Sequence, residues 1–159
     1  MLPKKTVIEI YTDGSTRKNG QANGGQGAWG FIAVVNNQII QESAEQIYNT
    51  TNQQCEMRAV LEACKWANEN YPNNAKIIYS DSAYVINCYK DKWYTKWINN
   101  GWIGSNKQPV KNREFWEKLI PYFDNMLFTF NKVKGHADNE YNNEIDNLVQ
   151  YMTLKMVNK

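Results

Sequence analysis

The spacing of hydrophobic and polar residues changes several times along the chain and predicts both strands and helices. Residues 6–12 alternate β-branched and polar side chains, which is typical of a half-buried strand, here ending at Asp13-Gly14. Residues 29–35 and 39–48 predict two further strands, joined as a hairpin through Asn36-Asn37, although this turn lacks the preferred Asn-Gly. The chain is therefore expected to begin with three antiparallel strands.

The spacing becomes helical from Asn52 to Asn70, where apolar residues recur on one face. Residues 75–80 show a short buried-strand pattern, and a helical run follows it to about Tyr89. A strand that leads directly into a helix is typical of a parallel crossover. This half of the chain therefore adds parallel strands to the antiparallel ones.

Regular spacing breaks off over residues 90–111 and returns beyond them. Residues 115–123 repeat at helical spacing, although Pro121 is expected to kink or end that helix. Residues 127–133 predict a last strand, and residues 145–156 form the apolar stripe of a C-terminal helix. We expect a single α/β domain spanning residues 1–159, with a mixed sheet covered by helices.

Composition excludes several classes of protein. With 42% hydrophobic and 21% charged residues, the chain is neither disordered nor collagen-like. No apolar run approaches the roughly 20 residues that span a bilayer, and the first five residues lead into a strand pattern instead of a signal peptide. Cys55, Cys64 and Cys88 form no CxxC pair, so we expect reduced thiols and a cytoplasmic protein.

Positive charge is concentrated in one segment, although the net charge is only +2. Residues 90–113 hold one acid, Asp91, against six basic residues: Lys90, Lys92, Lys96, Lys107, Lys111 and Arg113. The rest of the chain is net negative, so this segment is the candidate for binding a polyanion.

Four acids are candidates for chemistry. Asp13 and Asp81 both follow predicted strands, and functional groups collect beyond the carboxyl ends of parallel strands. Glu56 shares a helix face with apolar residues, where an uncompensated charge is costly. Asp146 is expected in the first turn of the last helix, at the edge of its apolar stripe.

Together these carboxylates predict a site for hard divalent cations such as Mg²⁺, which prefer oxygen ligands. Two such ions can activate a water and stabilise the leaving oxygen of a phosphodiester. Each acid also has a structural alternative: a turn for Asp13-Gly14, a helix cap for Asp81, a helix-dipole interaction for Asp146 and, less readily, a capping box for Glu56.

His136 lies in a predicted loop ten residues before Asp146. A near-neutral imidazole beside a metal ligand can relay protons or help products leave. The alternative is that His136 is structural or merely exposed.

Five motifs, in this order along the chain, resemble type 1 ribonuclease H: residues 11–15 (YTDGS), 50–56 (TTNQQCE), 79–82 (YSDS), 133–137 (VKGHA) and 142–146 (NNEID). The resemblance covers almost the whole chain. It implies a three-layer α/β fold with a five-stranded sheet in the order 3-2-1-4-5 and a basic protrusion at about residues 90–113.

The resemblance also implies the activity, which is endonucleolytic hydrolysis of the RNA strand of an RNA–DNA hybrid, leaving 5′-phosphate and 3′-hydroxyl ends. Two Mg²⁺ ions are implied as cofactors, with Mn²⁺ as the alternative. The metal ligands are then Asp13, which bridges both ions, Glu56 and Asp81 at one ion, and Asp146 at the other. His136 is implied as a mobile auxiliary residue.

Substrate-binding residues follow from the same resemblance. The protrusion implies contacts with the DNA strand through Trp93, Lys96, Trp97, Trp102, Lys107 and Lys111. Lysines pair with phosphates, whereas we expect the tryptophans to be mainly structural, as in a helical hairpin with its own aromatic core. Asn19, Asn52 and Gln53 match minor-groove positions and Thr51 a phosphate contact, although turn and cap chemistry also suit these residues.

Three departures from the family pattern concern the substrate. Ala83 stands where many relatives carry Gln, Asn49 where some carry Arg, and Ile98-Asn99-Asn100 replaces a strongly basic run. We therefore expect weaker and more salt-sensitive hybrid binding than is typical.

Other functions stay open at this point. They are a junction resolvase, a reverse-transcriptase domain, a silent hybrid-binding module and a structural α/β domain. The initial Met and the terminal helix favour a free-standing protein. Every apolar stripe in the sequence has an expected role in the core, so none suggests a protein partner. We expect a monomer without an obligate protein partner or membrane.

Overall fold

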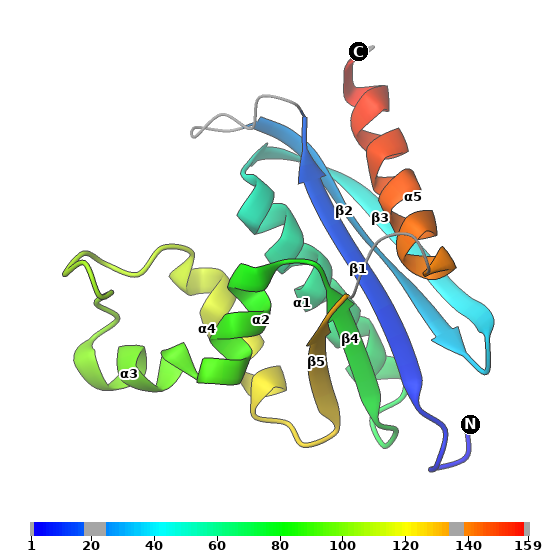
Figure 1. The fold of residues 1–159 in the computed structure, drawn as a ribbon, viewed down its shortest axis with the longest axis horizontal. Coiled ribbons are helices and arrows are strands. Elements are labelled where there is room, and N and C mark those ends of the chain that lie inside the picture. Colours follow the sequence, from blue (N-terminus) through cyan, green and yellow to red (C-terminus); the bar gives the residue numbers. More distant parts are fainter. Residues whose placement is uncertain (1, 18–24, 134–138, 158–159) are drawn as a thin grey trace.

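A single five-stranded sheet organises the molecule (Figure 1). The structure is a computed structural model that describes residues 2–17, 25–133 and 139–157. Its elements in chain order are β1 (Ile8–Thr16), β2 (Gly25–Val35), β3 (Gln38–Thr50), α1 (Asn52–Asn70), β4 (Lys76–Ser80), α2 (Ala83–Asp91), α3 (Trp93–Asn100), α4 (Arg113–Phe123), β5 (Phe128–Lys132) and α5 (Glu140–Val157).

The strand order is β3-β2-β1-β4-β5, and the sheet is mixed. β1 pairs antiparallel with β2, and β2 pairs antiparallel with β3. β4 pairs parallel with both β1 and β5. The expected fold class and strand order are therefore confirmed, as are the initial antiparallel strands and the parallel crossover.

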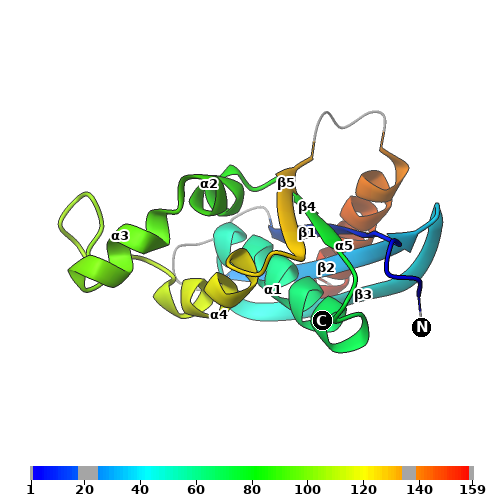
Figure 2. The same cartoon turned by 90° about the horizontal axis from the view of Figure 1, so that it is seen from below.

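Helices cover both faces of the sheet and make three layers (Figures 1 and 2). α1 packs on β1, β2 and β4, with α4 beside it. Of the described helices, only α5 crosses the other face, over β1, β2 and β3. α3 projects away from the sheet beyond α2 and α4. α1 and α5 therefore contact β1 from opposite faces of the sheet.

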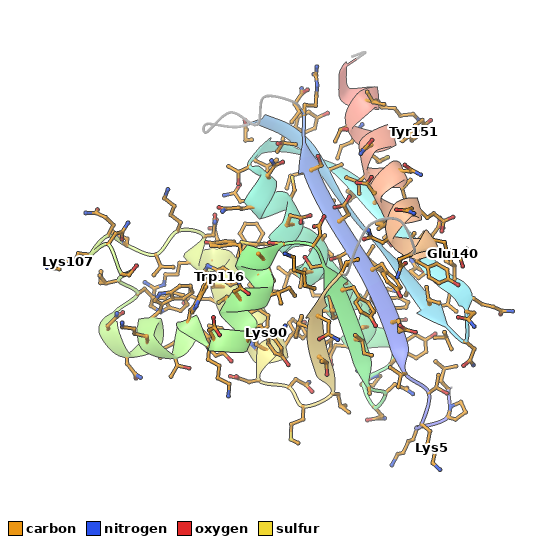
Figure 3. The ribbon with its side chains drawn as sticks, in the orientation of Figure 1. Lys5, Lys90, Lys107, Trp116, Glu140 and Tyr151 are labelled. Atoms are coloured by element: carbon orange, nitrogen blue, oxygen red, sulfur yellow. The ribbon has the colours of Figure 1, made fainter. Side chains whose placement is uncertain are left out.

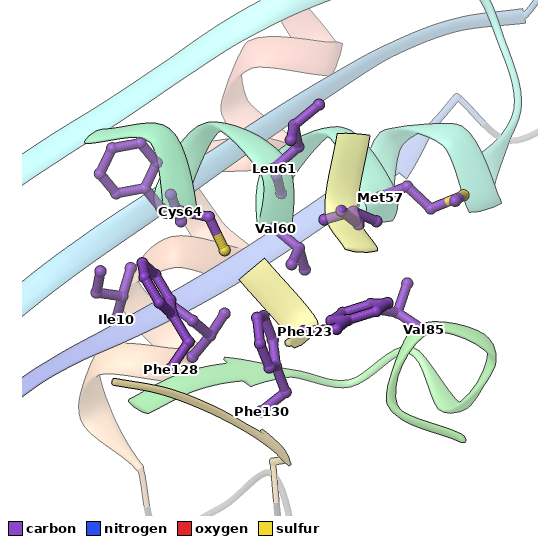
Figure 4. Packing of buried hydrophobic residues seen from close by; sticks show 14 of the residues in the cluster. Ile10, Met57, Val60, Leu61, Cys64, Val85, Phe123, Phe128 and Phe130 are labelled. Carbon is purple, nitrogen blue, oxygen red and sulfur yellow. The ribbon is translucent and has the colours of Figure 1, made fainter. Parts of the chain in front are cut away.

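The larger core lies between the sheet and the layer of α1, α2 and α4 (Figure 4). Val60 and Cys64 of α1 face Phe128 and Phe130 of β5 there, because the helical spacing seen in the sequence puts these apolar residues on one side. A smaller core beneath α5 consists of Tyr11, Ala28, Ile32, Val34, Ile145 and Val149. The predicted reduced thiols are confirmed, since all three cysteines are free and buried.

The first strand does not end where the sequence suggested. β1 continues through Asp13-Gly14 to Thr16, because it stays paired with β2 as far as the Thr16–Gly27 pair. The expected turn at Asp13-Gly14 is therefore wrong. The hairpin at Asn36-Asn37 is confirmed, and both residues have positive φ angles of 51° and 64°, which Asn tolerates better than most residues.

Two helices also differ from expectation. Residues 90–111 are not wholly irregular, because α3 lies within them and begins directly after Lys92, whose left-handed backbone ends α2. α4 runs through Pro121 and ends two residues later at Phe123. None of the described helices is long and apolar enough to cross a membrane.

Lys76 is a buried cation without an ion-pair partner among the described residues. It lies in β4, is 1% exposed, and its Nζ lacks a hydrogen-bond partner and stands 4.8 Å from the centroid of the Phe128 ring. Burial lowers the pKa of Lys76 from its usual 10.5.

We therefore expect Lys76→Met to raise the free energy of unfolding by about 1–3 kcal/mol at neutral pH, since the stem is kept and the buried charge is removed. The unfolded chain binds the Lys76 proton more tightly, so native stability rises with pH towards 10.5 and the advantage of Met shrinks. Urea unfolding near neutral pH and at about pH 10 measures both effects. A variant less stable than the native protein at neutral pH would contradict the prediction.

Candidate active site

The sheet brings Asp13 and Asp81 together just beyond the last parallel pair of β1 and β4. Tyr11 of β1 pairs with Tyr79 of β4, and the two acids stand two residues further along the chain from these partners. Asp81 is not the cap of α2, because the Ser82 side chain accepts the hydrogen bond from the Val85 N–H. The carboxylate of Asp81 is therefore available for another role.

Glu56 reaches the same place from α1. Thr51 caps this helix by accepting from the N–H of Gln54, so Glu56 is not part of a capping box. Instead, the Gly14 N–H of β1 donates to Oε1 of Glu56 at 2.5 Å. This bond fixes the Glu56 carboxylate against the strand that carries Asp13.

Gly14 permits this close approach of α1 to β1. A Cβ built on Gly14 would overlap the carbonyl group of Cys55 and lie 2.6 Å from the backbone N of Glu56. Our sequence interpretation missed this role and placed Gly14 in a turn. The available signal was a glycine next to a strand pattern, which often marks a close backbone approach.

Asp13, Glu56 and Asp81 form a cluster in which one carboxylate oxygen of each lies within 4.8 Å of the others. Asp13 is 8% exposed, and its Oδ2 has no hydrogen-bond partner among the described residues. Burial raises the pKa of Asp13 to about 8, and the charges of Asp81 and Asp146 contribute to this rise. Burial, followed by Asp81 and Asp13, also raises the pKa of Glu56.

Asp146 lies beside this cluster and acts on Asp13 from α5. The expectation that it stands in the first turn of that helix is wrong, because α5 begins at Glu140 and Asp146 falls in the second turn. It is half-buried, and its Oδ2 accepts from Nε2 of Gln150 at 3.2 Å. A first-turn interaction with the helix dipole therefore does not explain this acid.

The cluster suits a hard divalent cation. Its contacting atoms are carboxylate oxygens, the donor type that Mg²⁺ prefers, and the orphaned Oδ2 of Asp13 is a ligand atom without a partner among the described residues. Burial, and after it the charges of the neighbouring carboxylates, raise the pKa values of Asp13 and Glu56, and the charge of a bound cation would offset both effects.

The RNase H family model matches residues 5–153. The chain belongs to the RNase H family. It is 45% identical over 144 residues to the ribonuclease H of Clostridium botulinum strain Hall, covering 91% of this chain and 93% of that protein. It is 41% identical over 142 residues to the ribonuclease H of Thermoanaerobacter sp. strain X514, covering 89% and 86%.

Solved structures show the same RNase H fold. The crystal structure of LC9-RNase H1, described as a type 1 RNase H with the type 2 active-site motif, superposes with a TM-score of 0.79 at 19% identity. The match covers 98% of this chain and 75% of that one. The solution structure of the PFV RNase H domain gives 0.77 at 22% identity, covering 95% and 96%.

Only some of the other site residues expected from the family motifs lie within the described residues. His136 and Asn19 lie outside the described residues. Thr51 is the N-cap of α1, and Gln53 is exposed in its first turn. Oδ1 of Asn52 accepts from both the N–H and the hydroxyl of Thr16 at 2.8 and 2.6 Å, so α1 is tied to the end of β1.

We call residues 90–113 the protrusion. Its tryptophans form a packed aromatic cluster. The ring centroid of Trp97 lies 6.2 Å from that of Trp93, 5.8 Å from that of Trp102 and 5.7 Å from that of Trp116 in α4. Trp102 is buried, while Trp93 and Trp97 are half-buried. The cluster holds α3 against α4, as a structural role for these rings requires.

A groove of about 1160 Å³ runs along the protrusion, and Trp93 and Trp97 are among its lining residues. Lys96 and Lys111 line the same groove, and both are exposed. Lys107 is exposed at the far end of the protrusion, where Figure 3 shows it well away from the sheet. The protrusion of this RNase H therefore presents basic side chains over an aromatic base.

Proposed function

We propose that this protein is a ribonuclease H, an endonuclease that hydrolyses the RNA strand of RNA–DNA hybrids and leaves 5′-phosphate and 3′-hydroxyl ends. The observation that carries the proposal is the convergence of Asp13, Glu56 and Asp81 within 4.8 Å. The chain belongs to the RNase H family and has relatives named ribonuclease H at 41–45% identity. In such a chain, the cluster would hold the divalent ions that hydrolysis of the RNA strand requires.

Asp13, Glu56, Asp81 and Asp146 are the residues that would hold two divalent ions, and their all-oxygen donor set suits Mg²⁺, with Mn²⁺ as the alternative. When bound, such ions activate water for attack on a phosphodiester and stabilise the leaving oxygen. The carboxylates therefore serve as ligands and not as nucleophiles.

Neighbouring residues of the chain hold these carboxylates in place. The Gly14 N–H orients Glu56, and the Gln150 side chain orients Asp146. The backbone of Asp13 is fixed by its pairing with Gly30 of β2. Preorganised ligands of this kind avoid reorganisation during the reaction. We assign His136, which lies outside the described residues, the role of proton relay or product release.

Two regions would bind the hybrid. Asn19, Asn52 and Gln53 supply small polar groups for sensing the presence or absence of a 2′-hydroxyl in the minor groove, and Thr51 a hydroxyl for phosphate. On the protrusion, Lys96, Lys107 and Lys111 contact DNA phosphates, while Trp93, Trp97 and Trp102 shape the surface that carries them.

We also propose that residues 1–159 act as one domain, as a monomer in the cytoplasm. The continuous sheet, with helices on both faces, supports one folding unit. The three buried free thiols suit a reducing compartment.

Cleavage of an end-labelled RNA–DNA hybrid tests the function, with duplex RNA and duplex DNA as controls, in Mg²⁺ and then in EDTA. We expect metal-dependent cutting of only the RNA strand of the hybrid. Tight hybrid binding without cutting would instead indicate a silent binding module. Cutting of branched DNA would indicate a resolvase.

The lysines of the protrusion should determine how binding responds to salt. Replacing Lys107 by Ala is expected to reduce the slope of log affinity against log salt concentration by about 1, because one phosphate contact is lost. KM should rise while kcat stays nearly unchanged. Lys65→Ala, on the outer face of α1, is the matched control, and an equal change of slope in that variant would refute the assignment.

A further inference from the structure

The side chain of Gln54 joins the first turn of α1 to the start of α4. Its Nε2 donates to Oδ1 of Asn112 at 3.1 Å, and its Oε1 accepts from the hydroxyl of Thr50 at 3.4 Å. Both polar ends of the half-buried amide are thus engaged. Within the described parts of the chain, the bond to Asn112 is the only side-chain hydrogen bond between α1 and the segment 92–112.

Asn112 does not perform the local role that its position suggests. It is the N-cap of α4, where an Asn side chain ordinarily accepts from an N–H of the first turn, but here it makes no such bond. Its backbone also lies in the left-handed region, with φ 61° and ψ 29°. Its Oδ1 is directed to Gln54 instead, so the tertiary contact has displaced the local one.

The two residues connect the parts of the molecule that the proposed function uses together. Gln54 stands two residues before Glu56 on α1. Asn112 directly follows Lys111 and begins the helix whose Trp116 packs on Trp97 of the protrusion. A shift of α1 relative to α4 would therefore change the position of the carboxylates relative to the lysines.

We propose that Gln54 is a positioning residue that sets the protrusion relative to the carboxylates, so that one hybrid engages both at once. This inference rests on the proposed function. A duplex is stiff, so its binding at a second site gains from the first only where the spacing of the two sites matches the duplex. Loss of the Gln54–Asn112 bond leaves each region intact and loosens their spacing.

The test measures kcat and KM on hybrids of increasing length, from the shortest that the native protein still cuts. Gln54→Ala and the near-isosteric Gln54→Met are expected to raise KM about fivefold on long hybrids, the equivalent of one hydrogen bond, with kcat unchanged. The shortest hybrids, which do not span both regions, should show no change. Asn70→Ala, which removes an amide at the other end of α1, is the control.

A double-mutant cycle separates positioning from direct substrate contact. Asn112→Gly removes Oδ1 and tolerates the left-handed backbone, so combining it with Gln54→Ala should add nothing to the KM increase of either change. Additive effects, a loss confined to kcat, or equal KM increases at every hybrid length would overturn the proposal. Native cleavage of hybrids would still stand in that case, so the two failures are distinguishable.

Discussion

Asp13→Asn is expected to abolish hybrid cleavage, with a loss of at least about a thousandfold in rate, and to stabilise the metal-free protein at neutral pH. The loss of activity follows from the place of Asp13 in the carboxylate cluster, between Asp81 and Asp146. The amide keeps one neutral oxygen and removes the charge that a divalent ion requires.

The gain in stability follows from the raised pKa of Asp13. This carboxyl has a pKa of about 8 in the folded protein against an ordinary value of 3.8, so the folded state holds a proton that the unfolded state releases. Between these two values the native protein loses stability as the pH rises. Asn cannot ionise, so the variant should be more stable by about 1–3 kcal/mol near pH 8 and nearly equal near pH 4.

Urea unfolding in EDTA across this pH range measures the effect, and Glu69→Gln, an exposed acid near the end of α1, is the control. Adding Mg²⁺ should stabilise the native protein by about 2.7 kcal/mol at one hundred times the dissociation constant, and Asp13→Asn far less. A variant that is inactive but no more stable than the native protein in EDTA would show that burial and the neighbouring carboxylates do not destabilise the charged form of Asp13.

Much of the carboxylate cluster could be predicted from the sequence because its acids follow local patterns. Asp81 ends an apolar strand and Glu56 occupies the apolar face of a helix, so their positions depend mainly on the periodicity of nearby residues. The structural alternatives could not be weighed in that way. Residue spacing does not determine that Ser82 caps α2, or that the Gly14 N–H donates to the Glu56 carboxylate.

The misplaced boundaries have a common cause in tertiary contacts. β1 continues beyond Asp13 because β2 offers partners to its last residues, which the alternation in residues 6–12 cannot reveal. α3 is only eight residues long and depends on support from outside, because its Trp97 packs on Trp116, more than ten residues later. In both places the partner lies elsewhere in the chain and overrides the local pattern.

Gly14→Ala is the second change with a large expected effect, and it tests the geometry of the cluster without altering any acid. The added Cβ would meet the carbonyl group of Cys55 and the backbone N of Glu56, which cannot move aside as a side-chain end can. α1 must then withdraw from β1. We expect the free energy of unfolding to fall by about 3 kcal/mol.

The same displacement should lower the cleavage rate about a hundredfold, since a shift of about 1 Å between catalytic groups has this effect. Gly104→Ala, whose Cβ approaches only Asn106 and Gln108 of the protrusion, is the control for stability. If Gly14→Ala kept full activity in Mg²⁺, the carboxylate of Glu56 would not need its present distance from Asp13. The cluster would then tolerate a looser arrangement than three oxygens within 4.8 Å, and the ligand role of Glu56 would have to be given up.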